Sequence, residues 1–204
     1  PQSPSDEQIL LRADADGVAT LTLNRPGSGN SLSHALVDAL STTLRQIADD
    51  ADVRVVVLAA NGKHFCTGHD LKESIATKTG DEKRASNAAC NAMMQAIVDL
   101  PQPVIAKVHG TATASGCELM ASCDLAVAAQ SARFATPGVN IGFWCYTPQV
   151  ALSRAVSRKH ALEMLLTGEL YPSEDALRMG LVNRVVPDDE LDAAMAEAEE
   201  AAEA

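Results

Sequence analysis

The sequence predicts an α/β fold organised around a parallel sheet, and three observations support this prediction. Strand-like and helix-like segments alternate along the first 60 residues, and strands separated by helices favour parallel pairing. The run VRVVVLAA at residues 53–60 is rich in β-branched residues, which is typical of a strand covered on both faces. With 204 residues, 47% of them hydrophobic, the chain can bury a sizeable core, which excludes a disordered or fibrous protein.

Charge and cysteine content limit the partners and the compartment. A formal net charge of -11 argues against nucleic acid or an anionic membrane surface as the main partner, although local cations could still hold a small anion. The cysteines are odd in number and contain no C-x-x-C pair, so we expect reduced core thiols. No membrane-spanning run or signal-peptide core is present, and we therefore expect a soluble cytoplasmic protein. The cysteines are Cys66, Cys90, Cys117, Cys123 and Cys145.

The first quarter of the chain reads as a lead-in, a hairpin, a helix and a strand. Residues 9–12 and the alternating segment 18–24 predict a hairpin that turns at residues 14–17. The composition of RPGSGN, residues 25–30, indicates a loop. Ser33 is placed to cap a helix whose apolar residues recur at helical spacing through residue 48.

The remaining elements follow from apolar spacing and from helix-breaking residues. We expect a turn-rich segment at 61–72, with a short helix from Asp70, and a small-residue turn at 111–116. Residues 134–142 are expected to be irregular, and the Ala/Glu-rich helix after residue 188 is expected to have little to pack against. The other predicted helices are 81–100, 117–123, 148–156, 158–167 and 173–179, and the other predicted strands are 104–108, 125–129 and 181–186.

These elements predict one main unit. We assign residues 1–8 to a disordered lead-in and residues 9–186 to the core, which includes the helical segment 148–180. Residues 187–204 are expected to begin an incomplete C-terminal helical region.

Two turns that follow neighbouring predicted strands form the candidate site. One turn leads to Ser115 and to Glu118, which lies three residues later on the same helix face, where a carboxylate can exchange protons. The other contains Gly68, where the backbone can approach a ligand closely, and then His69. Turns after neighbouring parallel strands face one crevice, and two backbone N–H donors aimed at one oxygen form an oxyanion hole.

Four segments in register resemble the enoyl-CoA hydratase/isomerase (crotonase) family. The resemblance covers about residues 19–186. It implies a spiral of ββα units that binds acyl-CoA thioesters, assembled as a homotrimer or a dimer of trimers. Coenzyme A would be part of the substrate, and no other cofactor is expected. The segments read RPGSGNSLS, GKHFCTGHDLKE, PVIAKVHGTATASGCELMASCDLAVA and LTGELYPSEDALRMGLVNRVV.

The resemblance also assigns roles to individual residues. It implies that the backbone N–H groups of His69 and Ser115 hold the thioester oxygen and that Glu118 is the general acid and base. No metal site is expected, because His64 and His69 are five residues apart and no carboxylate or thiol completes a ligand set. The residues expected to bind the coenzyme A portion are Arg25, Ser28, Gly68, Asp70, Leu71 and Lys72.

One position departs from the family pattern and leaves several activities open. The second family glutamate falls on Gly138, which cannot do acid–base chemistry. Enoyl-CoA hydration by the single Glu118 is the nominal activity. Enoyl-CoA isomerisation, thioester hydrolysis, decarboxylation and acyl-CoA binding without catalysis are the alternatives.

A serine hydrolase is the competing enzyme class. Ser115 would be the nucleophile, with His69 or His109 as its base and Asp70 or Asp124 orienting that base. The segment TASGC lacks both outer glycines of the G-x-S-x-G elbow, which weighs against this interpretation.

Overall fold

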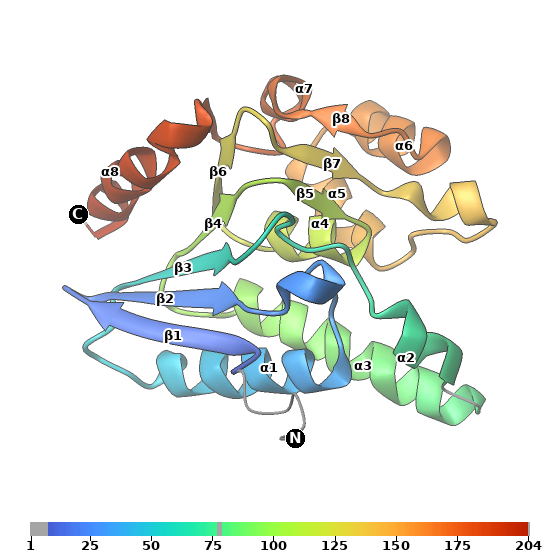
Figure 1. The fold of residues 1–204 in the computed structure, drawn as a ribbon, viewed down its shortest axis with the longest axis horizontal. Coiled ribbons are helices and arrows are strands. Elements are labelled where there is room, and N and C mark those ends of the chain that lie inside the picture. Colours follow the sequence, from blue (N-terminus) through green and yellow to red (C-terminus); the bar gives the residue numbers. More distant parts are fainter. Residues whose placement is uncertain (1–7, 77–78, 204) are drawn as a thin grey trace.

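A six-stranded sheet forms the centre of the fold (Figure 1). The computed structural model describes residues 8–76 and 79–203, so most of the predicted lead-in lies outside the described residues. The strands lie in the order β1-β2-β3-β4-β6-β9, and every neighbouring pair is parallel except the β1–β2 hairpin. This arrangement confirms the predicted α/β class. The strands are β1 Leu10–Ala15, β2 Val18–Leu23, β3 Val55–Ala60, β4 Val104–Val108, β6 Leu125–Ala129 and β9 Arg184–Val186.

Local sequence accounts for the hairpin and the first helix. The hairpin turns at Asp16 and Gly17, both with positive φ, which suits glycine and is tolerated by aspartate. Helix α1, His34–Ala48, begins at Ser33, whose side chain accepts a hydrogen bond from the backbone N–H of Leu36. The predicted hairpin and cap are both confirmed.

The central strands are buried on both faces. Along β3, Val56 and Leu58 belong to the main core with helices α1 and α3, Gly80–Val98, whereas Val55 and Val57 belong to a second core. Helix α8, Leu191–Glu203, covers that second face and packs on β3, β4 and β6. The expectation that this helix has little to pack against is therefore wrong. Among the described side chains of α8, those buried are Leu191, Ala194, Met195 and Ala198; the sequence pattern indicates an apolar face at Leu191 and Met195 alone.

A second, three-stranded sheet lies beside the first and carries the site. It consists of β5 Thr111–Thr113, β7 Arg133–Ala135 and β8 Tyr171–Pro172. The expectations of a plain turn at 111–116 and irregular backbone at 134–142 were wrong at β5 and β7. Strands of two or three residues have too few positions to show an alternating pattern, and long-range pairing stabilises them.

The remaining helices surround the second sheet and the ends of the central strands (Figure 1). They match the predicted segments to within a few residues. None of the described helices is long and apolar enough to cross a bilayer. These helices are α2 Leu71–Ala76, α4 Ser115–Ala121, α5 Pro148–Ala155, α6 Arg158–Thr167 and α7 Ser173–Met179, with 3₁₀ turns at Pro26–Ser28, Pro137–Ile141 and Asp188–Glu190.

Candidate functional site

The two predicted turns meet, because the strands before them are neighbours and their backbones then pair directly. Strands β3 and β4 are parallel partners. Beyond them, the N–H of Cys66 donates to the carbonyl of Thr111 (3.2 Å), and the N–H of Thr113 donates to the carbonyl of Cys66 (3.0 Å). These bonds fix the turn containing Gly68 against the start of α4.

The turns approach each other so closely that only glycine fits at position 68. Gly68 has φ +93°, and a Cβ added there would lie 3.2 Å from the backbone N of Ser115 and 2.9 Å from the Cβ of Ala114. In the described part of the chain, the N–H groups of His69 and Ser115 donate to no other protein group. Two unpaired backbone donors on adjoining turns are the components of an oxyanion hole.

The backbone is strained where α4 begins. Ala114 adopts φ 50° and ψ −125°, a conformation that residues with a Cβ rarely adopt. Its N–H donates to the carbonyl of Ala135 on β7 (2.9 Å), which ties this turn to the second sheet. Such conformations persist only where the surrounding structure enforces them, and they concentrate at functional sites.

Glu118 is a buried carboxyl on α4 whose surroundings favour the protonated form. Only 6% of the residue is exposed. Burial raises the pKa of Glu118 to about 7, and hydrogen bonds from the side chains of Thr147 and Ser115 oppose this rise. The Thr147 hydroxyl donates to Oε2 at 2.9 Å. A carboxyl that titrates near pH 7 can both take up and release a proton under physiological conditions.

The side chains of Ser115 and His69 are in direct contact. The Ser115 Oγ lies 2.8 Å from the Nδ1 of His69. Burial, followed by the nearby His34, lowers the pKa of His69, so the imidazole is neutral at pH 7. The serine-hydrolase interpretation predicts His69 or His109 as the base for Ser115, and the structure places the His69 side chain in contact with Ser115. The other residues of that reading lie elsewhere: His109 contacts the carbonyl of Gly62, Asp124 accepts from the N–H of Val104, and Asp70 pairs with Arg25.

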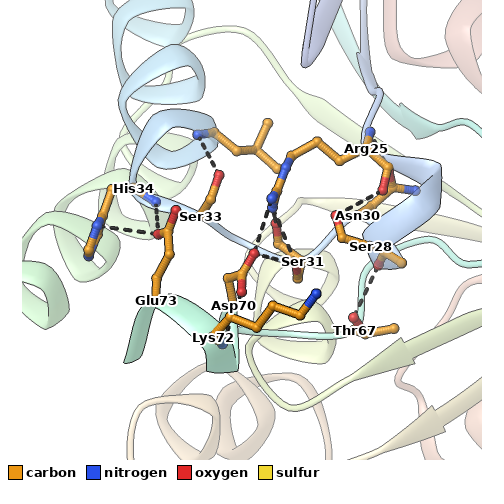
Figure 2. A network of polar contacts seen from close by, with 12 residues as sticks. Arg25, Ser28, Asn30, Ser31, Ser33, His34, Thr67, Asp70, Lys72 and Glu73 are labelled. Carbon is orange, nitrogen blue, oxygen red and sulfur yellow. Dashed lines mark hydrogen bonds and ion pairs between the residues drawn. The ribbon is translucent and has the colours of Figure 1, made fainter. Parts of the chain in front are cut away.

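The residues expected to bind coenzyme A divide into a fixed cluster and exposed side chains. Figure 2 shows Arg25, Ser31 and Asp70 pointing toward one another. The Arg25 guanidinium lies 3.0 Å from the Asp70 carboxylate and also donates to the carbonyl of Ser31. Burial alone would raise the pKa of Asp70, but its hydrogen bonds, led by that from Arg25, lower it overall. Arg25 therefore braces the loop beside Gly68, whereas Ser28, Leu71 and Lys72 are exposed.

Gly138 stands where the family pattern places a second glutamate, and neighbouring groups fill the space around it. Gly138 is buried, and a Cβ added there would lie 2.7 Å from the carbonyl oxygen of Phe143 and 2.8 Å from the Sγ of Cys145. Burial raises the pKa of the Cys145 thiol, which therefore stays protonated at neutral pH. The structure has no room for a larger residue at position 138 without movement of the 143–145 segment.

Thr147 contributes to the site although no sequence motif identifies it. This residue precedes α5, and 29 positions separate it from Glu118, to which it donates its hydroxyl hydrogen. No motif connects the two residues in the sequence. Helices α4 and α5 pack together, and this packing brings the hydroxyl to the carboxylate.

A family model and several curated proteins match this chain. The model described as enoyl-CoA hydratase/isomerase matches residues 13–204. The chain is 43% identical over 191 residues to the mitochondrial enoyl-CoA hydratase domain-containing protein 3 of Mus musculus, covering 94% of this chain and 64% of the relative. The Homo sapiens protein of that name is 46% identical over 176 residues, covering 86% of this chain and 58% of the relative. The chain thus spans less than two thirds of these curated relatives.

Solved structures agree in fold. An enoyl-CoA hydratase from Mycobacterium smegmatis superposes with a TM-score of 0.92 at 53% identity, covering 94% of this chain and 75% of that one. The human enoyl coenzyme A hydratase domain-containing protein 3 superposes with a TM-score of 0.87 at 44% identity, covering 96% of this chain and 78% of that one.

The relatives correct one expectation, the cytoplasmic localisation. The similar proteins from Mus musculus, Rattus norvegicus, Xenopus laevis, Homo sapiens and Danio rerio are all named mitochondrial. Unpaired cysteines are compatible with any reducing compartment, so they could not distinguish the cytoplasm from another such compartment.

Proposed function

The chain belongs to the enoyl-CoA hydratase/isomerase family, and from this premise we propose that it adds water to a 2-enoyl-CoA thioester. The observation that carries the proposal is the buried Glu118, with its pKa near 7, beside the two unpaired N–H donors of His69 and Ser115. No cofactor other than the coenzyme A of the substrate takes part. The active assembly is a homotrimer or a dimer of trimers, which light scattering would test.

The two N–H groups act on the thioester carbonyl oxygen. Attack by water at the β-carbon moves negative charge onto this oxygen, and the N–H groups of His69 and Ser115 hold it. Donors that are fixed in advance by paired backbone lower the barrier by several kcal/mol, typically about 3 for each donor. The pairing of Cys66 with β5 supplies that rigidity.

Glu118 moves the proton. Its ionised form accepts a proton from the attacking water, and the resulting carboxylic acid then gives a proton to the α-carbon of the enolate. One carboxyl serves both steps because its pKa of about 7 makes neither form strongly favoured. The Thr147 hydroxyl, 2.9 Å from Oε2, holds the carboxylate during this exchange.

Ser28 in the 25–31 loop and the exposed residues at the start of α2 bind the coenzyme A portion. Lys72 offers a cation to a phosphate, and Ser28 and Leu71 are also exposed. Gly68 lets the thioester approach the backbone. Arg25 and Asp70 hold the loop through their ion pair.

Restoring the second glutamate is expected to harm the protein. Gly138→Glu should lower the free energy of unfolding by roughly 1–3 kcal/mol or more, because its Cβ meets the Phe143 carbonyl and its carboxylate is buried. Urea unfolding measures this change, with Gly138→Ala as the control that adds the Cβ without the charge. Higher hydratase activity at unchanged stability would contradict the arrangement described around Cys145.

Thioester hydrolysis is the second candidate, and the 2.8 Å contact between Ser115 and His69 favours it. In that reaction the Ser115 hydroxyl attacks the thioester carbon, His69 accepts its proton and passes it to the departing sulfur, and coenzyme A leaves as the thiol; water then cleaves the acyl-serine to the free acid. Enoyl-CoA isomerisation and decarboxylation would use the same N–H donors. Acyl-CoA binding without catalysis would leave the raised pKa of Glu118 without a role.

The test follows purified protein with crotonyl-CoA by two readouts. Loss of the conjugated enoyl-thioester absorbance without release of free thiol is the result expected for hydration. Release of thiol that Ser115→Ala abolishes would instead establish hydrolysis. Binding of the thioester with neither change would overturn the hydratase proposal.

A further inference from the structure

Thr147 stands at the N-cap of helix α5 but its side chain does not cap the helix. A threonine in this place usually accepts, through its side chain, from the N–H of the second or third helical residue. Here the N–H of Gln149 donates to the carbonyl of Cys145 (3.1 Å), and the N–H of Val150 donates to the backbone carbonyl of Thr147 (3.0 Å). The Thr147 hydroxyl donates instead to Oε2 of Glu118, at 2.9 Å.

The backbone of Thr147 has a helical conformation that the next residue disfavours. Its φ is −80° and its ψ is −46°. The ring of a following proline, here Pro148, favours extended backbone in the residue before it. An extended Thr147 would have the usual geometry of a helix cap, and its hydroxyl would turn toward the N–H groups of α5. The hydroxyl therefore stays on Glu118 only if the segment before Thr147 is held in place.

That segment, residues 143–146, is shaped by bonds to its neighbours in the sequence. The N–H of Phe143 donates to the carbonyl of Gly138 (2.9 Å). The indole N–H of Trp144 donates to Oε1 of Gln149 (2.9 Å). Both bonds lie within residues 138–149, so they fold the segment without fixing it to another helix or sheet.

One hydrogen bond joins the end of this segment to another helix. The side-chain amide of Asn87, on α3, donates to the phenol oxygen of Tyr146 at 2.7 Å. In the part of the chain that the structure describes, no other hydrogen bond from residues 143–146 reaches beyond residues 138–149. The ring of Phe143 packs at an angle on the ring of Tyr146, with centroids 5.8 Å apart. Asn87 thus holds the residue directly before Thr147.

Helix α3 is a firm support for this bond. Asn87 lies three residues before Cys90, the first of the buried residues of α3. The neighbouring Ser86 is itself held, because its Oγ lies 2.8 Å from Nε2 of His34 on α1. Helices α1 and α3 pack against each other along the main core. The amide of Asn87 therefore connects Tyr146 to a packed part of the fold.

We propose that Asn87 is a positioning residue for Glu118: its amide holds Tyr146 on α3, and this contact keeps the adjacent Thr147 hydroxyl on the carboxylate. The two non-covalent steps are hydrogen bonds of 2.7 Å and 2.9 Å, and the step between them is a peptide bond. The positioning role stands on this geometry. Only its effect on turnover rests on the proposed hydration reaction.

A hydroxyl held in this way favours the ionised form of Glu118. Donation to a carboxylate opposes the effect of burial, which raises the pKa of Glu118. Three thiols from three parts of the fold also interact with this carboxylate, and burial raises their pKa values, so they stay protonated at neutral pH. These are Cys90 of α3, Cys117 of α4 and Cys145 before α5.

The first test measures the pKa of Glu118 by ¹³C NMR of glutamate-labelled protein, with the signal assigned by Glu118→Gln. Thr147→Val removes the hydroxyl and keeps the shape, so the pKa should rise by about one unit, and Thr147→Ser should restore it. Tyr146→Phe and Asn87→Ala each remove one end of the anchoring bond, and each should raise the pKa by about half a unit.

Asn91→Ala is the matched control for Asn87→Ala. Asn91 lies one turn later on α3 and is exposed, and its side chain forms no hydrogen bond with another described residue. This control should leave the pKa of Glu118 unchanged. A pKa that also stays unchanged in Asn87→Ala and Tyr146→Phe would overturn the proposal.

A double variant separates positioning from a general loosening of the site. Once Thr147→Val has removed the hydroxyl, adding Tyr146→Phe should raise the pKa of Glu118 no further. If Tyr146→Phe raised the pKa equally with and without the Thr147 hydroxyl, Tyr146 would act on Glu118 by another route, and the proposal would be wrong.

Turnover distinguishes this proposal from the function it deepens. In Tyr146→Phe, kcat/KM for crotonyl-CoA should fall about threefold at pH 6 and change little at pH 8, because half a unit of pKa lowers the ionised fraction about threefold below the pKa. An equal fall at both pH values would contradict the positioning role. If the pKa rises as expected but even the parent protein does not hydrate crotonyl-CoA, the proposed function is overturned and the positioning role is supported.

Discussion

Glu118→Gln is expected to lower kcat for hydration of crotonyl-CoA by about 10²–10⁴-fold, the usual contribution of general acid–base catalysis. Glutamine keeps the length of the side chain and an oxygen that can accept from Thr147, but it cannot exchange a proton. The backbone donors of His69 and Ser115 remain, so binding of the thioester should change little. Loss of enoyl absorbance measures kcat, and calorimetry with a saturated acyl-CoA measures binding.

The pH dependence of the unsubstituted protein should follow the same residue. Glu118 must be ionised to accept a proton from water, and its pKa is about 7. We therefore expect kcat/KM to rise with pH through about 7 and then to level off. A profile already flat between pH 5 and 8 would indicate that another group accepts the proton.

The pH dependence of stability tests the raised pKa of Glu118 independently of activity. A rise in pH should increase activity but lower the contribution of Glu118 to stability. Its pKa is raised from 4.5 to about 7 on folding, so the folded protein keeps a proton that the unfolded chain loses between these values. The contribution of Glu118 to the free energy of unfolding therefore falls as the pH rises from 4.5 to about 7. Glu118→Gln should therefore be more stable than the parent above pH 7, by up to about 3 kcal/mol. Urea unfolding at pH 5 and pH 8 measures the difference, which should be larger at pH 8.

Local patterns were enough to predict the elements that form the central sheet. The β-branched run at 53–60 is buried on both faces as β3, and Ser33 caps α1 as its position suggested. The turns at Gly68 and Ser115 could be placed together because each follows a strand of one parallel sheet. In each case a few neighbouring residues determine the backbone, and the sheet topology then brings the turns together.

Contacts between distant residues could not be predicted in this way. The Glu118–Thr147 hydrogen bond and the pairing of β5 with β7 join positions far apart in the sequence. They depend on how α4, α5 and the second sheet pack, and the strands of that sheet are too short to show a pattern. The residues proposed as catalytic could therefore be named from the sequence, whereas Thr147, which donates to Glu118, could not.

Gly116→Ala is expected to be the most disruptive single-methyl substitution at the site. Gly116 is the second residue of α4, and a Cβ added to it would lie 2.0 Å from the carbonyl oxygen of Cys66 and 2.6 Å from its carbon. Both atoms are backbone, and Cys66 is held by its two hydrogen bonds to β5. Neither side can move without breaking that pairing, so we expect a loss of about 3 kcal/mol in the free energy of unfolding, at the upper end for overpacking.

The same methyl group should reduce catalysis through geometry alone. Separating Cys66 from α4 also separates the N–H of His69 from that of Ser115, although neither residue is changed. Loss of one such donor typically lowers kcat by 10²–10³-fold, and a fall of that order is expected here in the fraction that still folds. Gly27→Ala is the matched control, because a Cβ there meets nothing within 4 Å and should leave stability nearly unchanged. If Gly116→Ala were as stable and active as Gly27→Ala, the two turns could not be in backbone contact. The proposed oxyanion hole, which depends on that contact to hold both donors on one oxygen, would then have no structural basis.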